Sequence, residues 1–530
     1  MSTAAFPWSR TMLSYHLWMM ILVVGTLLGA GGGWTASVAT AAQPADPERL
    51  TNIIDRALDD PDFDGTHWGV VVIDLEADSL VYDRNPRTRM LPASNVKLYT
   101  AAAALDQLGP DYRYETPLYA AGLVRADTLH GDLIVRGSGD PTVGHEDAHS
   151  DTLDSDSYDP TTPMQAWADS LQVAGITHIT GDLVGDASWI QGPPLGRGWT
   201  WDNTPFGYSA EMSGLVFNQN TIDLTVTGQR IGKQAWLHTE PATDFVELDN
   251  HSLTIPASAE GTTEVDRLLG RNTIEVRSHV PAGSIDDHTL AVTQPNYYFT
   301  QVFHDVLGEA GITVDGEQRV TQDPKRAPSY EGLPPLTAHQ SPPLAEIVRE
   351  FNQESDNLYA EQVLRTLGAE RPIDEDEVDD DVVPGSTEMG VAAAMRTLDT
   401  APVDTSAIQW ADGSGLSRHN QKPPLATAEL LRYMWSHPNE AVRSAFLDSL
   451  PLGGEDGTLS YRFQRQAPAN RNVRAKTGTL ANVSSLSGYV TTNGGTPLAF
   501  AIMCNHHLTE ASRVREAQDL IINALARQGW

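Results

Sequence analysis

Apolar and polar positions alternate along the chain with periods that change several times, and each period predicts a kind of element. PERLTNIIDRAL (47–58) has the apolar spacing of an amphipathic helix. HWGVVVIDLEADSLVYDRN (67–85) predicts two strands around an acidic turn. In LPASNVKLYTAAAAL (91–105), a run of alanines among strong helix formers predicts a closely packed, buried helix from about Ser94 to Leu105.

From about residue 111 to residue 292 the pattern changes to short β-like segments, such as HGDLIVRGSGDPT, that Gly, Pro and Asp interrupt. Frequent turns of this kind predict small β-rich domains. Helical periodicity then returns in NYYFTQVFHDVLGEAG, PPLAEIVREFNQESDNLYAEQVLRTLG and TEMGVAAAMRTLD. NVRAKTGTL and SSLSGYVTTNGGTPLAFAIMCN predict strands, the second of them a hairpin, and ASRVREAQDLIINALARQG predicts a closing helix.

Helices and antiparallel strands thus lie on both sides of the β-rich region in the sequence. This order indicates an α+β fold, with an antiparallel sheet flanked by helices and interrupted in sequence by inserted β-rich domains. We expect one domain from residues 45–110 and 293–530, and the insertion between residues 111 and 292. A length of 530 residues agrees with about three domains.

The amino terminus has the pattern of an export signal. Arg10 precedes the apolar run MLSYHLWMMILVVGTLLGA, and small residues follow up to Ala41. We therefore expect residues 1–41 to be a signal peptide and the protein to be periplasmic or secreted. The apolar run is long enough that an uncleaved anchor is the alternative, and membrane association depends on that alternative.

Charge narrows the choice of partners. The chain has 35 Lys and Arg against 70 Asp and Glu, a formal net charge of −35. Such a surface repels nucleic acid, so no nucleic-acid partner is expected. A strongly acidic surface with few lysines also suits a salty environment, where screening relieves self-repulsion.

Candidate chemistry begins with one of the few lysines of the chain. Lys97 follows Ser94 by three residues, so both side chains lie on one face of the predicted helix. A serine hydroxyl becomes a nucleophile when a neighbouring base removes its proton, and an amine serves when burial lowers its pKa. Alone, the pair also fits a helix cap followed by a surface lysine.

Two further motifs follow in the sequence. Ser355, Asp356 and Asn357 form a Ser-Asp-Asn at a predicted helix break, which also fits an ordinary turn. Lys476, Thr477 and Gly478 lie on a predicted strand, where a lysine can hold a substrate carboxylate and a glycine keeps the strand edge open.

The three motifs SNVK, SDN and KTG form the catalytic set of β-lactamases and penicillin-binding proteins. With them, the chain resembles a penicillin-binding protein of the D-alanyl-D-alanine carboxypeptidase/endopeptidase type (low-molecular-mass class C). Ser94 and Ser355 are 355 − 94 = 261 residues apart, and that branch inserts extra domains between these two motifs. GDLIVRGSGDPT, ADGSGLSRHN and LPLGGEDGTLSYR extend the resemblance.

The resemblance implies a β-lactamase/transpeptidase-like domain and a serine D-Ala-D-Ala carboxypeptidase, with DD-endopeptidase activity as a further option. Its substrates would be peptidoglycan stem peptides, and β-lactams would be covalent inhibitors. It implies catalytic roles for Ser94 (nucleophile), Lys97 (base), Ser355 and Lys476 (proton relay to the leaving D-alanine) and Asn357 (substrate amide). Thr477, Gly478 and Thr479 would bind substrate, and the N–H groups of Ser94 and Thr479 would form an oxyanion hole.

Two alternatives to this function remain at the level of sequence. His145, Glu146 and His149 match the zinc-protease pattern H-E-x-x-H, but their flanks lack the apolar face of the helix that this pattern needs. A non-catalytic peptidoglycan-binding scaffold is the second alternative, although it has no need of a paired Ser and Lys. We expect no metal and no cofactor, and Asp356 has no expected role beyond capping a helix.

Overall fold

The structure is a computed structural model that describes residues 47–145, 158–374, 378–379 and 382–530. The predicted signal peptide, residues 1–41, lies outside the described residues. Within the described part of the chain, no helix combines the length and the apolar character that a membrane crossing requires.

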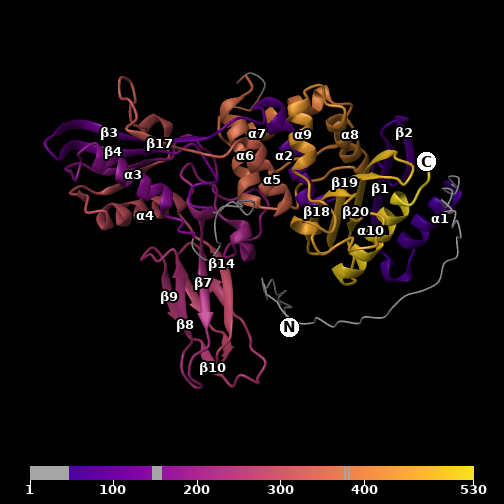
Figure 1. Cartoon of the computed structure of the whole chain (residues 1–530), viewed down its shortest axis with the longest axis horizontal. Helices are drawn as coiled ribbons and strands as arrows, with labels where there is room; N and C mark the ends of the chain where they lie inside the picture. Colours follow the sequence, from indigo (N-terminus) through magenta and orange to yellow (C-terminus); the bar gives the residue numbers. More distant parts are fainter. Residues whose placement is uncertain (1–46, 146–157, 375–377, 380–381) are drawn as a thin grey trace, which may run out of the picture.

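A five-stranded antiparallel sheet joins the two ends of the described chain (Figure 1). Its central strand comes from the carboxy-terminal part and pairs with an amino-terminal strand, with Ile502 opposite Val70. The strands in spatial order are β18 (Arg474–Leu480), β19 (Val483–Thr491), β20 (Pro497–Asn505), β1 (His67–Asp74) and β2 (Ser79–Arg84). The sequence predicted each of these five strands.

Helices cover both faces of this sheet because its central strands are apolar on both sides. Val70 and Val72 of β1 pack with α1 (Pro47–Leu58) and α10 (Ala511–Ala526) on one face. Val71 and Ile73 pack with α8 (Pro424–Trp435) on the other. The remaining helices of this domain share a hydrophobic core with α8: α2 (Val96–Gln107), α5 (Leu344–Gln353), α6 (Asn357–Glu370), α7 (Thr387–Thr400) and α9 (Glu440–Asp448).

Helix α2 is the centre of this helical layer. Its alanines at 101–104 are fully buried, and such small side chains let neighbouring helices approach closely. The sequence placed the helix start near Ser94. In the structure, Ser94 lies in a 3₁₀ turn, η2 (Ala93–Asn95), and the α-helix begins at Val96.

The inserted region forms a second body with its own hydrophobic core (Figure 1). Its larger sheet contains β3 (Glu115–Arg125), β4 (Thr128–Arg136), β5 (His178–Ile179), β6 (Leu183–Asp186), β15 (Thr313–Val314), β16 (Gln318–Thr321) and β17 (Thr337–Gln340), with α3 (Thr162–Val173) and α4 (Pro295–Glu309) beside it. Three smaller sheets contain β7 (Thr221–Thr227), β8 (Trp236–Glu240) and β14 (Ile285–Ala291); β9 (Glu247–Asn250), β11 (Val265–Arg267) and β12 (Thr273–Val276); and β10 (Leu253–Ile255) and β13 (His279–Pro281).

Strand pairing bears on the end of the insertion. We expected it at residue 292, but β15, β16 and β17 pair with β5, β6 and β3. These pairings join segments far apart in sequence, so no local pattern reveals them. We therefore propose that the insertion extends to Gln340. The region also contains the helix α3, which we did not predict although Met164, Trp167 and Leu171 have helical spacing.

Candidate active site

Ser94 and Lys97 lie at the start of the buried helix layer. The Ser94 side chain is partly exposed, whereas that of Lys97 is fully buried. Lys97 Nζ is 3.3 Å from Ser94 Oγ, and it donates to Asn357 Oδ1 at 2.6 Å and to the Ser414 carbonyl at 2.9 Å. The amine is therefore held beside the hydroxyl by two acceptors from other parts of the chain.

Burial changes the proton affinity of this amine. Desolvation lowers the pKa of Lys97 to about 8, against the opposing charges of Asp356, Glu361 and Asp412. At pH 7 about a tenth of Lys97 is thus uncharged and able to accept a proton, far more than of an exposed lysine.

Lys476 and Ser355 form a second amine–hydroxyl pair in the same site. Lys476 Nζ donates to Ser355 Oγ at 2.9 Å, and the lysine is fully buried. Desolvation, together with the charge of Lys97, lowers the pKa of Lys476 well below its usual value. Asn95 Nδ2 donates to the Lys476 carbonyl at 2.9 Å and so ties strand β18 to the turn that carries Ser94.

The Ser-Asp-Asn motif forms the break between α5 and α6. Ser355 has a φ of 66°, a left-handed conformation that ends α5 and that non-glycine residues rarely adopt. Asp356 caps α6, because its Oδ1 accepts from Tyr359 N at 2.7 Å; the capping expected for it is confirmed. Asn357 binds Lys97 through Oδ1 and donates through Nδ2 to the Tyr208 carbonyl at 2.7 Å.

Gly478 brings strand β18 against the nucleophile turn. A Cβ at this position would lie 2.9 Å from Ser94 N and 2.3 Å from Ser485 Oγ, distances that atoms do not tolerate without a shift. Beside it, Thr477 Oγ1 donates to Thr458 Oγ1 at 2.9 Å, and Thr479 is exposed. Only a glycine allows the strand and the turn to be this close.

A buried loop, residues 412–417, completes the surroundings of Lys97; the segment DGSGLSR that contains it also fits an ordinary turn, and the resemblance implied a place near the active site. Ser414 supplies the carbonyl that accepts from Lys97. Glu361, one helical turn after Asn357, is fully buried and accepts from Gly413 N and Ser414 N, each at 2.9 Å. The spacing of Asn357 and Glu361 on one face of α6 is the sequence signal that was available.

The zinc alternative receives no support from the described part of the site. Glu146 and His149 lie outside the described residues, and His145 Nδ1 is 2.8 Å from Tyr359 Oη. Across the described ranges, no group of three His, Cys, Asp or Glu side chains is arranged to hold a metal ion.

The structure thus brings together the three motifs that the sequence placed far apart. A serine hydroxyl beside a buried amine, with a second hydroxyl–amine pair near it, is the arrangement of serine-type hydrolases of the penicillin-binding class. The fold is the one expected, a β-lactamase/transpeptidase-like domain with inserted β-rich domains.

Comparison with known proteins identifies the family. The D-Ala-D-Ala carboxypeptidase 3 (S13) family matches residues 50–528, and the chain belongs to it. A D-alanyl-D-alanine carboxypeptidase of Actinomadura sp. (strain R39) is 33% identical over 91% of this chain and 85% of its own length. The carboxypeptidase DacB of Haemophilus influenzae is 25% identical over 84% of this chain and 87% of its own length.

A solved structure has the same fold over most of its length. Penicillin-binding protein 4 of Haemophilus influenzae superposes with a TM-score of 0.74 at 24% identity, covering 91% of this chain and 98% of that one. Membership of the family makes the chain a serine-type hydrolase.

Proposed function

We propose that this chain is a serine D-alanyl-D-alanine carboxypeptidase that removes the terminal D-alanine of peptidoglycan stem peptides through an acyl-enzyme on Ser94. The observation that carries the proposal is Lys97 Nζ, fully buried and 3.3 Å from Ser94 Oγ. Family membership and the names of the relatives support the substrate class.

In the first step, neutral Lys97 takes the proton of Ser94, and Oγ attacks the carbonyl carbon of the penultimate D-alanine. The oxyanion that forms accepts from the backbone N–H groups of Ser94 and Thr479. The C–N bond then breaks, and Ser355 with Lys476 relays to the leaving amine the proton that Lys97 took from Ser94. Water hydrolyses the resulting ester and regenerates Ser94.

The carboxylate of the leaving D-alanine would lie along strand β18. Thr477 and Thr479 offer it hydroxyl groups, while Gly478 keeps the strand close to Ser94. Asn357 orients Lys97 through Oδ1 and is the residue we assign to the substrate amide. A β-lactam mimics the same terminal dipeptide, so we propose that it acylates Ser94 as well.

Covalent labelling tests the proposal. We expect a fluorescent penicillin to label the wild-type chain and not Ser94→Ala, because the ester forms on that hydroxyl. Ser436→Ala, at an exposed serine after α8, is the matched control and should label normally. Labelling that survives in Ser94→Ala would refute the assigned nucleophile, and an unlabelled wild-type chain would favour the scaffold alternative.

Product analysis tests the reaction and the acceptor. Incubation with purified muropeptides should give stem peptides that have lost one alanine, as seen by mass spectrometry. Release of monomers from cross-linked dimers would add endopeptidase activity. A chelator should leave both rates unchanged, since no step uses a metal; inhibition by the chelator would contradict this mechanism.

We also propose that the chain acts outside the cytoplasm, in the periplasm or as a secreted protein, because its substrate is there and residues 1–41 have the pattern of a signal peptide. The amino-terminal sequence of the exported protein tests this: a mature chain that begins near residue 42 supports cleavage, and one that retains Arg10 supports an anchor.

A further inference from the structure

The inserted region contacts the Ser-Asp-Asn motif directly. Gln219 Nε2 donates to Asp356 Oδ2 at 2.8 Å, and the Tyr208 carbonyl accepts from Asn357 Nδ2 at 2.7 Å. Both contacts join parts of the chain that are more than a hundred residues apart in sequence. The site is therefore built partly by the insertion, and not only by the domain that carries the three motifs.

Gln219 occupies an unusual turn. Asn218, Gln219 and Asn220 have φ angles of 46°, 54° and 54°, three consecutive non-glycine residues in the left-handed region. Side chains with a Cβ adopt this region rarely, and a strained backbone persists only where its surroundings impose it. Such strain is a reason to ask what the turn positions.

The surroundings impose the turn through Asn220, which is fully buried. Its Nδ2 donates to Ser213 Oγ at 3.0 Å, and its Oδ1 accepts from Phe217 N at 3.2 Å. On the other side, Asn218 N donates to the Val143 carbonyl at 2.9 Å. These bonds fix the backbone of Gln219 from both sides, and its side chain then extends to Asp356.

The contact with Asp356 determines how α6 begins. Asp356 uses Oδ1 to cap α6 at Tyr359 N, and Gln219 holds the other oxygen, so the carboxylate cannot rotate freely. Asn357 is the next residue, and the Tyr208 carbonyl accepts from its Nδ2. With Nδ2 occupied, Oδ1 faces Lys97 Nζ.

We propose that Gln219 is a positioning residue of the active site, and that the insertion serves catalysis by orienting Asp356 and Asn357 toward Lys97. The proposal rests on the function given above, since it assumes that Lys97 activates Ser94. Gln219 itself does not contact the reacting atoms. It acts through the carboxylate of Asp356 and the amide of Asn357.

Acylation by a fluorescent penicillin, followed in time and over a range of pH, tests the proposal in the full chain. Gln219→Ala removes the donor to a carboxylate, and we expect the acylation rate to fall about tenfold. Gln172→Ala is the matched control, because Gln172 also lies in the insertion and donates a 2.8 Å bond, but to the Ala310 carbonyl away from the site. It should acylate at the wild-type rate.

A second variant separates positioning from a general loss of structure. In Gln219→Glu the introduced carboxyl repels Asp356 when ionised, but it donates to Asp356 when protonated. Because the neighbouring Asp356 raises the pKa of the introduced carboxyl above that of a free glutamate, the rate of this variant relative to wild type at the same pH should rise as the pH falls below neutral, whereas that of Gln219→Ala should not.

Three outcomes would overturn the proposal: wild-type acylation in Gln219→Ala, an equal loss in Gln172→Ala, or a relative rate of Gln219→Glu that does not change with pH. These outcomes differ from a failure of the proposed function. In that case the wild-type chain would not be labelled, or Ser94→Ala would be labelled as well.

Discussion

The protonation of Lys97 connects the geometry of the site to its chemistry. The amine is buried beside Ser94, and three carboxylates oppose the loss of its charge. In the proposed mechanism, only the neutral amine accepts the Ser94 proton. Because the protonated form dominates below its pKa, the fraction of competent enzyme increases as the pH rises.

We therefore expect acylation to depend on pH with a midpoint near the pKa of Lys97, about 8. The rate should rise through this region and level off above it. Rapid mixing with a chromogenic cephalosporin at a series of pH values measures the midpoint. A rate that stays constant between about pH 6 and 9 would contradict the role of Lys97 as base.

Glu361 gives a second prediction at this scale. Burial raises its pKa to about 7, so it carries part of a negative charge near Lys97 at neutral pH. Glu361→Gln removes this charge, which favours the neutral form of Lys97. The midpoint of the pH–rate curve should move to lower pH, although stability falls by about 1 to 3 kcal/mol because one loop N–H loses its acceptor.

Glu370→Gln is the control for this measurement, since Glu370 ends the same helix and contacts Tyr112 instead of the loop. Its midpoint should equal that of the wild type. If Glu361→Gln merely slows acylation equally at every pH, then Glu361 is structural and does not tune Lys97.

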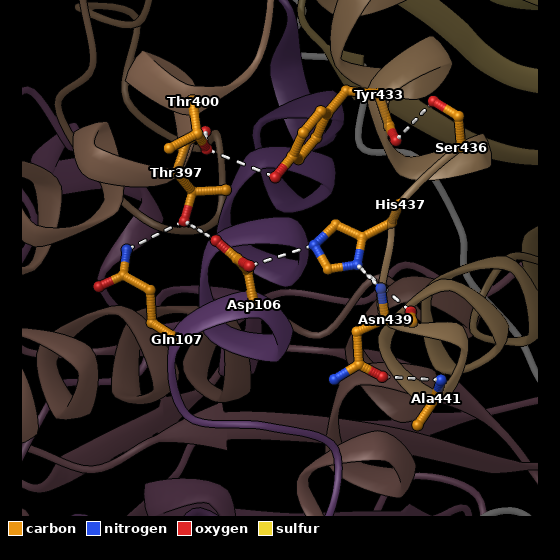
Figure 2. A network of polar contacts seen from close by, with 9 residues as sticks. All are labelled: Asp106, Gln107, Thr397, Thr400, Tyr433, Ser436, His437, Asn439 and Ala441. Atoms are coloured by element: carbon orange, nitrogen blue, oxygen red, sulfur yellow. Dashed lines mark hydrogen bonds and ion pairs between the residues drawn. The ribbon is translucent and has the colours of Figure 1, made fainter.

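Helix α2 is fixed at both ends. Its first turn carries Lys97, and its last residues, Asp106 and Gln107, belong to a polar network with α7 and the segment after α8 (Figure 2). Asp106 binds His437 Nε2 at 3.1 Å and accepts from Thr397 Oγ1 at 2.7 Å. An acidic residue at a helix carboxyl end is unfavourable, and these donors offset the cost.

Thr397→Val tests the contribution of this network. It removes a hydroxyl that donates to Asp106 and accepts from Gln107 while it keeps the size of the side chain. We expect the free energy of unfolding in urea to fall by about 1 to 3 kcal/mol, with little change in acylation by the folded protein. Thr400→Val, at an exposed position of the same helix, should lose much less.

Local periodicity was sufficient to predict most of these elements, and it located the helix break at Ser355 and the hairpin of β19 and β20. It did not reveal partners that only the fold brings together. Glu361 binds amides some fifty positions later, and Gln219 reaches Asp356 from another domain. The three motifs were found because each is contiguous, whereas the residues that orient them are dispersed.

At the scale of the whole molecule, charge is the dominant property. A net charge of −35 creates self-repulsion that extends over about 30 Å at 0.01 M salt and only about 3 Å at 1 M. We expect the melting temperature to rise from low salt to molar sodium chloride, as followed by circular dichroism. A neutral osmolyte at equal osmolality is the control, and a melting temperature that salt leaves unchanged would contradict this expectation.

The pairing of β1 with β20 has a consequence for synthesis. Strand β1 can pair with β20 only after β20 has been made, and α6 is made only after the whole insertion has been synthesised. A nascent chain thus carries its serine for most of translation without the amide, the second lysine or the completed sheet that would make it reactive. We therefore expect an incomplete polypeptide to be inactive, and hydrolysis to begin only after β20 has paired with β1.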